Sequence, residues 1–177
     1  MKLHAIAIAV VTGIFASWSA SAADAPAMPK VGDKAPLVEG IDQDGKPWKL
    51  SDDIGKKVVL LYFYPKDQTP GCTREACGFR DSIDALKAEN VEVIGVSFDT
   101  SESHLKFITK YKLNFPLIAD TDGKIADTYG VRMAGRSMAN RVSFLIGLDG
   151  KIVHVTNSPN AEKHISEMTA AAAKLKG

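Results

Sequence analysis

The chain has 177 residues, of which 45% are hydrophobic and 24% charged, and its formal net charge at pH 7 is +1. Because 22 basic residues are balanced by 21 acidic ones, the chain lacks the positive field that nucleic-acid binding requires, and we expect no nucleic-acid partner. The length is sufficient for one domain with a substantial hydrophobic core.

The first 22 residues have the pattern of a secretory signal peptide. A single charge at Lys2 precedes an apolar run from Ala5 to Phe15, and small residues follow up to Ala22. The run is much shorter than the roughly 20 apolar residues of a membrane span, so we expect a soluble periplasmic or secreted protein without stable membrane insertion. An uncleaved N-terminal anchor is the alternative. Residues 23–30 are predicted to form a flexible leader, and residues 31–177 a single domain.

The domain is predicted to begin with a hairpin and a buried strand. The segments 37–41 and 47–50 flank Asp44-Gly45, a favoured turn sequence. Residues 57–64, which read KVVLLYFY, form a continuous apolar and β-rich run, as a strand buried on both faces requires.

A helix that carries both cysteines is predicted directly after this strand. Thr69 is suited to the N-cap and Pro70 to the first helical position, and apolar residues then recur at helical spacing as far as Leu86. Cys72 therefore falls in the first turn, where free amides and the partial positive charge of the helix favour a thiolate.

The second cysteine, Cys77, follows five residues later. On an ideal helix this spacing separates the two Cα atoms by about 8.6 Å, beyond the limit of about 7 Å for a disulfide, so bonding requires local unwinding. A structural disulfide is the ordinary interpretation of two cysteines in an exported protein, but so short a loop constrains the unfolded chain little. A zinc site is poorly supported, since no histidine lies nearby in sequence.

The remaining elements alternate between strands and helices. They comprise strands at 91–98 and 115–119, helices at 101–111 and 123–129, a hairpin of 142–146 with 152–155, and a final helix at 161–176. Parallel β-α-β units followed by a hairpin and a helix predict an α/β protein of thioredoxin-like fold, with helices on both faces of a central mixed sheet. The pattern alone leaves other α/β topologies open.

One segment resembles a known active site. Pro65-x-x-x-Thr69-x-x-Cys72 resembles the signature of the peroxiredoxins, and the wider run, with its second cysteine five residues on, is similar to the peroxiredoxin Q or bacterioferritin comigratory protein group. Arg141 falls where that family carries its distant active-site arginine. The resemblance extends from about Val31 to the C-terminal helix.

This resemblance implies a thiol-dependent peroxidase without a cofactor. Cys72 would be the peroxidatic cysteine, which attacks hydrogen peroxide or an organic hydroperoxide and becomes a sulfenic acid. Cys77 would resolve it as an intramolecular disulfide, which a thioredoxin-like dithiol protein then reduces. The resemblance also implies a monomer.

Other residues fit that reaction. Arg141 would stabilise the thiolate and the charge that develops on the peroxide oxygens. Thr69 would orient the peroxide or simply cap the helix, and Pro65 would shield the thiolate or simply end the strand. Glu75 would pair with an arginine near the site, or would be an acidic residue that merely favours a first helical turn.

Histidines and the loop at 132–140 give weaker signals. His104, His154 and His164 lie in separate elements, so no Cys-His pair is predicted, and we expect most of them at the surface. Arg132 and Arg136 are expected to be solvated in a loop that is shorter than in many of the peroxiredoxin Q group.

Two other functions remain open. An exported thiol-disulfide oxidoreductase is less well supported, because such proteins place their cysteines as Cys-x-x-Cys. The other is a non-enzymatic binding domain with a permanent disulfide.

Overall fold

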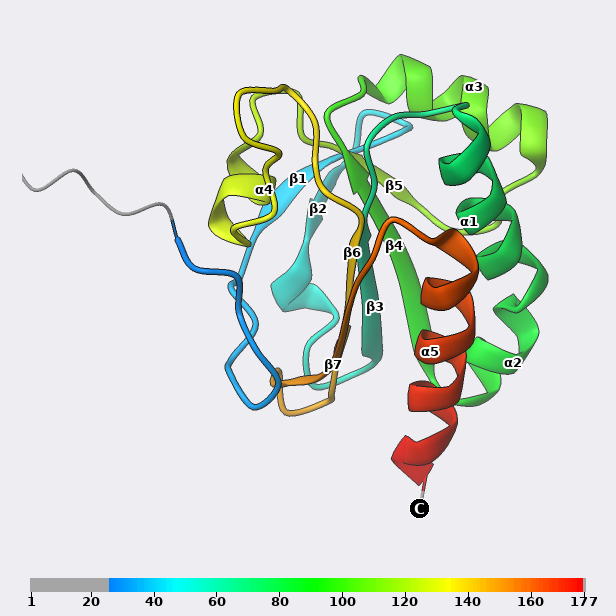
Figure 1. Ribbon diagram of the computed structural model, residues 1–177. Coiled ribbons are helices and arrows are strands. Elements are labelled where there is room, and N and C mark those ends of the chain that lie inside the picture. Colours follow the sequence, from blue (N-terminus) through cyan, green and yellow to red (C-terminus); the bar gives the residue numbers. More distant parts are fainter. Residues whose placement is uncertain (1–25, 177) are drawn as a thin grey trace, which may run out of the picture.

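The computed structural model describes residues 26–176, and the predicted signal peptide lies outside the described residues. In this part of the chain seven strands form one sheet, in the order β2-β1-β5-β4-β3-β6-β7 (Figure 1). The strands are β1 (Glu39–Asp42), β2 (Pro47–Lys49), β3 (Val58–Phe63), β4 (Val91–Ser97), β5 (Leu117–Ala119), β6 (Val142–Ile146) and β7 (Ile152–Asn157). The helices are η1 (Leu50–Asp52), α1 (Pro70–Asp81), α2 (Ile83–Ala88), α3 (Ser101–Tyr111), α4 (Lys124–Thr128), α5 (Ala161–Ala173) and η2 (Lys174–Lys176).

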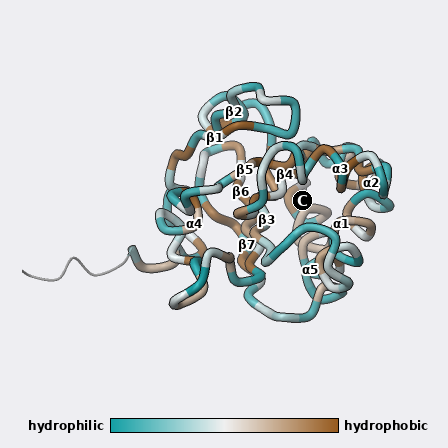
Figure 2. The backbone as a smooth tube through the Cα atoms, turned by 90° about the horizontal axis from the view of Figure 1, so that it is seen from above, coloured by the Kyte–Doolittle hydropathy of each residue, from teal (hydrophilic) through white to brown (hydrophobic). Residues whose placement is uncertain are grey.

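Strand β3 lies in the interior of the sheet, where it pairs in parallel with β4 and antiparallel with β6. All six of its residues are buried, because helices or loops cover both faces of the sheet there. Its side chains alternate between two apolar clusters, so that Leu60 and Tyr62 face one and Leu61 and Phe63 the other. In Figure 2 the hydrophobic segments accordingly gather in the strands.

The predicted thioredoxin-like arrangement, a mixed sheet with helices on both faces, is confirmed. Helices α1, α2, α3 and α5 contribute to the first apolar cluster, whereas α4 and η1 contribute to the second (Figure 1). The β4–β5 pair is parallel, and the β1–β5 and β6–β7 pairs are antiparallel. Between residues 26 and 176, no helix has the length and apolar character that crossing a membrane would need.

The helix predicted to continue to Leu86 is interrupted at Ser82. Ser82 leaves the helical conformation, with φ −94° and ψ 2°, and separates α1 from α2. The interruption lets the two segments pack differently: α1 lies mainly against α5, and α2 against β4. The helical spacing of Ile83 and Leu86 is real, but it belongs to a second helix.

The residues predicted as a leader contact the domain where they are described. Met28 packs against the second apolar cluster, and its sulfur lies 3.9 Å from the side-chain nitrogen of Asn157. The backbone at 26–28 also passes so close to Gly130 that a Cβ there would meet the carbonyl oxygen of Pro26 at 2.4 Å. The domain boundary at residue 31 stays a prediction.

Candidate active site

Cys72 lies at the start of α1, as predicted. Thr69 is the N-cap residue, Pro70 begins the helix, and the Cys72 side chain is buried. The chain reaches this point through Gln68, whose positive φ of 58° turns the backbone sharply after the loop that leaves β3. The thiol is thus held at the positive end of a helix and away from bulk solvent.

Arg141 reaches this thiol from a distant part of the chain. It directly precedes β6, whose first residue, Val142, pairs with Phe63 at the end of β3. Its Nη2 donates a hydrogen bond to Cys72 Sγ at 3.4 Å, and its Nε donates to the carbonyl oxygen of Pro159 at 3.2 Å. The predicted meeting of Cys72 and Arg141 is present in the structure.

A glycine in α1 makes this approach possible. A Cβ at Gly71 would lie 3.2 Å from Arg141 Nη2, so a side chain there would press on the guanidinium. Burial by itself lowers the pKa of Arg141, but Glu75 and Cys72 outweigh it and raise that pKa. The cation beside the thiol is therefore permanent.

Glu75 is the second acidic partner of Arg141. Its carboxylate oxygen Oε2 accepts from Arg141 Nη1, and both side chains are almost completely buried. Glu75 lies beyond the first turn of α1, so the alternative role as a first-turn acid is wrong. Burial raises the pKa of Glu75 to about 7, although Arg141 acts in the opposite direction.

His164 lies behind Glu75, and its burial contradicts the expectation that most histidines are at the surface. Its Nδ1 is 2.7 Å from Ser143 Oγ and 3.6 Å from Glu75 Oε1, and its Nε2 is 2.9 Å from the carbonyl oxygen of Ser158. Burial lowers the pKa of His164. The spacing of Ala161, His164, Met168 and Ala172, the buried residues of α5, is the sequence signal that would have placed it inside.

A second buried histidine, His104, belongs to a polar cluster that the sequence did not reveal. Asp67, in the loop between β3 and α1, accepts hydrogen bonds from Tyr64 Oη and Ser103 Oγ, both at 2.7 Å. His104 Nδ1 lies 3.0 Å from Asp67 Oδ2, and the backbone N–H of Asp67 donates to Asp99. This cluster fixes the loop that leads to Cys72.

Thr69 and Pro65 lie in the same loop. The Thr69 hydroxyl donates to the carbonyl oxygen of Lys66 at 3.0 Å and makes no side-chain cap on α1, so the capping role predicted for this hydroxyl is wrong. Pro65 lines a pocket of about 220 Å³ together with Arg141. The other residues that line it are Met133, Asn140, Asn157, Ser158 and Pro159.

Cys77 is half-buried on the same helix, and both cysteines are free thiols. Next to it, a Cβ on Gly78 would lie 2.1 Å from Ile165 Cδ1, which shows how closely α1 and α5 pack. Arg80 holds the next turn through a 2.6 Å hydrogen bond from its Nη1 to the carbonyl oxygen of Tyr111. Because both cysteines lie on continuous helix, their ideal separation of about 8.6 Å applies and disulfide formation requires α1 to unwind.

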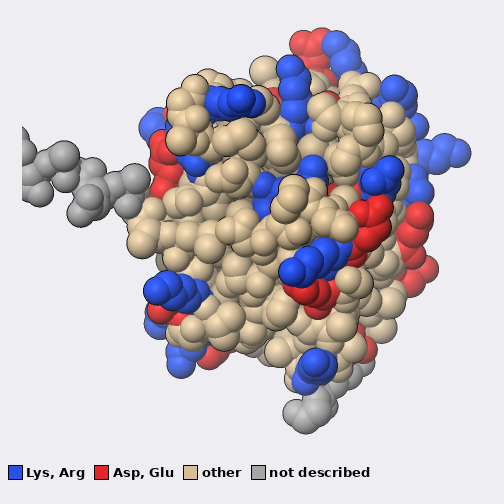
Figure 3. Space-filling model, in the orientation of Figure 1, with Lys and Arg blue, Asp and Glu red and all other residues tan. Residues whose placement is uncertain are grey.

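The loop at 132–140 is held against the α4 region by Arg132 and is not simply solvated. Arg132 pairs with Asp127 on α4 and donates to the carbonyl oxygen of Asp122 at 2.9 Å, which corrects the expectation for this residue. Arg136 is exposed, as expected. Basic and acidic side chains are both spread over the face drawn in Figure 3, and uncharged residues cover most of it.

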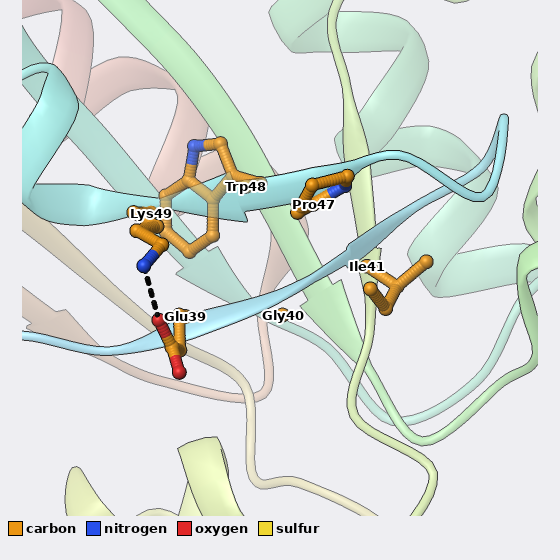
Figure 4. Close-up of a pocket in the computed structure, with 6 residues that line it drawn as sticks. All are labelled: Glu39, Gly40, Ile41, Pro47, Trp48 and Lys49. Atoms are coloured by element: carbon orange, nitrogen blue, oxygen red, sulfur yellow. Dashed lines mark ion pairs between the residues drawn. The ribbon is translucent and has the colours of Figure 1, made fainter.

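Another pocket, of about 430 Å³, lies on the β1–β2 hairpin (Figure 4). Trp48 and Pro47 line it, and the ion pair of Lys49 with Glu39, at 3.0 Å, lies at its side. Neither cysteine contributes to it.

Among residues 26–176, no three metal-binding side chains are grouped as a metal site would require. The candidate active site is the cluster of Cys72, Arg141 and Glu75, because it holds a buried thiol in hydrogen-bond contact with a cation.

Comparisons with known proteins agree on one family. The family model described as "AhpC/TSA family" matches residues 31–155. The chain is 43% identical over 141 residues to "Peroxiredoxin Bcp" of Escherichia coli strain K12, covering 76% of this chain and 90% of that protein. It is also 43% identical over 138 residues to "Peroxiredoxin Q, chloroplastic" of Sedum lineare, covering 76% and 73%.

A solved structure is similar over nearly the whole described chain. The crystal structure of "Peroxidoxin BcpB" from Mycobacterium tuberculosis superposes with a TM-score of 0.79 at 32% identity, covering 84% of this chain and 99% of that one.

Proposed function

The chain belongs to the AhpC/TSA family and is a thiol-dependent peroxidase of the Bcp and peroxiredoxin Q group, and we propose that Cys72 is its peroxidatic cysteine and Cys77 its resolving cysteine. The observation that carries the assignment of Cys72 is the hydrogen bond from Arg141 Nη2 to its sulfur at 3.4 Å. A guanidinium and a helix N-terminus together stabilise a thiolate, the form of cysteine that attacks a peroxide.

The thiolate attacks the terminal oxygen of the hydroperoxide. A bond forms between sulfur and that oxygen as the O–O bond breaks, and the remaining oxygen leaves as hydroxide or alkoxide. Arg141, which has further N–H groups in its planar fork, stabilises the negative charge that develops on the peroxide oxygens. Cys72 is left as a sulfenic acid.

Thr69 and Pro65 shape the approach to the sulfur. The Thr69 hydroxyl donates to the Lys66 carbonyl oxygen, so its lone pairs are free to accept a hydrogen bond from the peroxide O–H. Pro65 lines the pocket beside Arg141. Its proposed role is to limit the access of water to the thiolate. Hydrogen peroxide and organic hydroperoxides are both proposed as substrates.

Cys77 then attacks the Cys72 sulfenic acid, water leaves, and an intramolecular disulfide forms. Since α1 holds the two cysteines too far apart, this step follows local unwinding of the helix. A thioredoxin-like dithiol protein restores both thiols by disulfide exchange.

The cellular compartment and the oligomeric state of the protein are also proposals. The pattern of residues 1–22 supports export to the periplasm or secretion, and the mature chain is proposed to act as a monomer. Intact mass of the protein recovered from the exported fraction tests the first point, and sedimentation of the reduced and oxidised protein tests the second.

Peroxide consumption by single-cysteine variants tests the assignment. Cys72→Ser is expected to consume no hydrogen peroxide with thioredoxin as reductant, whereas Cys77→Ser reacts once and then stops. Insulin reduction is measured beside it, because a thiol-disulfide oxidoreductase would turn over insulin and leave peroxide untouched. Undiminished peroxide consumption by Cys72→Ser would show that another residue is the nucleophile.

A further inference from the structure

Two acids share one cation in the interior of this site. Arg141 contacts Cys72 Sγ through Nη2 and Glu75 through Nη1, and its side chain is only 8% exposed while that of Glu75 is fully buried. If both acids ionise, the cluster has a net charge of −1 in a place with little water, which is costly. If one proton remains on either acid, the cluster is neutral.

Among the residues that the structure describes, no other group that faces Glu75 supplies a second positive charge. The described groups around it are Tyr62 on β3, Cys72 on α1, Arg141 directly before β6, Ser143 on β6, and His164 on α5. Tyr62 stays neutral, because burial, and then the charge on Glu75, raise its pKa well above the usual value. Burial lowers the pKa of His164, so it too is neutral near pH 7.

The hydrogen bonds of His164 leave one oxygen of Glu75 without a donor. Since a carbonyl oxygen only accepts, His164 Nε2 carries the ring proton that it donates to Ser158. Its Nδ1 therefore accepts from the Ser143 hydroxyl and has no proton to offer Glu75 Oε1, which lies 3.6 Å away. Within the described chain Oε1 is buried and has no hydrogen-bond partner.

We propose that Glu75 holds the proton that Cys72 gives up when its thiol ionises, with Arg141 as the fixed cation between the two acids. The free Oε1 is the atom that takes the proton. Cys72 can then be a thiolate while the buried cluster stays neutral. Glu75 acts through Arg141, and it is a positioning residue rather than one that touches the peroxide. The proposal rests on Cys72 being the reacting thiol.

The stored proton also balances the reaction. When the S–O bond forms and the O–O bond breaks, sulfur is oxidised and the peroxide oxygen is reduced, and the terminal O–H stays on sulfur as the sulfenic acid. The leaving alkoxide or hydroxide takes up one proton to become alcohol or water. Once the thiolate charge has disappeared, Glu75 ionises and pairs fully with Arg141, and the proton that it releases equals the one taken up.

Infrared difference spectroscopy of the reduced Cys77→Ser protein at pH 7 tests this proposal. We expect the carbonyl band of a protonated carboxylic acid, shifted in D₂O. The band is lost when Glu75→Gln is added and at least twofold weaker when Cys72→Ser is added, because a larger fraction of Glu75 ionises beside Arg141 when no thiolate is present. It also weakens, by at least twofold, as hydrogen peroxide converts Cys72 to the sulfenic acid. Glu102→Gln, at an exposed position on α3, is the matched control and leaves the band unchanged.

Alkylation of Cys72 by iodoacetamide is measured on the same samples to show the thiolate independently. A Cys72 that alkylates as a thiolate without a carboxylic acid band overturns the proposal, and so does a band of full strength in Cys77→Ser/Cys72→Ser. That second variant decides the matter even if Glu75→Gln does not fold. If the sample consumes no peroxide, the assignment of Cys72 fails instead, and the two failures are distinguishable.

Discussion

Arg141 Nη2 lies 3.4 Å from Cys72 Sγ although the two residues are 69 positions apart in the chain. The contact depends on the pairing of β3 with β6, which brings the residue before Val142 beside the loop that leads from Phe63 to α1. The pairing of these two interior strands thus aligns the nucleophile and the cation.

Replacing Arg141 by lysine is expected to slow the reaction of Cys72 with hydrogen peroxide by about 100- to 1,000-fold, the usual cost of losing one positioned donor in a site of this kind. A single ammonium group cannot hold Glu75 and Cys72 at once in the geometry of a planar fork. Stopped-flow measurement of the first turnover in the Cys77→Ser background gives the rate. Arg136→Lys, in the exposed part of the loop, is the control, and an equal loss there would contradict the role of Arg141.

The contact of Gly78 with Ile165 predicts an unusual effect of alanine in a helix. Alanine ordinarily stabilises a helix by about 1 kcal/mol relative to glycine. Here the new Cβ would lie 2.1 Å from Ile165 Cδ1, and we expect Gly78→Ala to lower the free energy of unfolding by about 1–3 kcal/mol. Urea denaturation of the reduced protein measures it.

Shortening the partner side chain tests the same contact. In Ile165→Val, which lacks the Cδ1 atom, Gly78→Ala is expected to cost less than in the wild-type background. A Gly78→Ala protein more stable than wild type would mean that α1 and α5 do not pack in this way.

The buried cluster around Asp67 predicts that a substitution at this loop position lowers the free energy of unfolding. Asp67→Ala leaves Tyr64, Ser103 and His104 without their shared acceptor, and the expected loss is about 2–4 kcal/mol. Thermal and urea unfolding provide the values. Asp84→Ala, at an exposed site on α2, serves as the comparison and is expected to lose much less. Equal losses in both variants would show that the hydrogen bonds of this cluster do not add to the free energy of unfolding.

The raised pKa of Glu75 predicts that the free energy of unfolding depends on pH. Its pKa in the folded protein is about 7, above its ordinary value of 4.5, so the folded state binds more protons than the unfolded state between these values. The stability that this group contributes is therefore present below pH 4.5 and is lost as the pH rises to 7, by about 3 kcal/mol. His164, whose pKa burial lowers, acts in the opposite direction below its ordinary value of 6.5.

The difference between wild type and Glu75→Gln isolates the contribution of Glu75, because both proteins retain His164. The difference in free energy of unfolding, measured by urea denaturation from pH 4.5 to 7.5, is expected to change steadily over this range. A difference that does not depend on pH would mean that Glu75 ionises normally in the folded protein.

The sequence was enough to predict the order of strands and helices and the position of Cys72, because a buried strand, a helix start and the motif at 65–72 are all local patterns. Arg141 was found only through the family resemblance, since no local pattern relates it to Cys72. Interactions that depend on tertiary packing were missed, among them the full burial of Glu75, the histidine behind it and the Asp67 cluster. The interruption at Ser82 was missed because apolar spacing continues through it.

Peptide mapping of the reduced protein after one equivalent of hydrogen peroxide tests the roles of Cys72 and Cys77 most directly. We expect wild type to contain an intramolecular Cys72–Cys77 disulfide, and Cys77→Ser to carry a sulfenic acid on Cys72 that dimedone traps. An oxidised protein in which Cys72 remains a free thiol would contradict it.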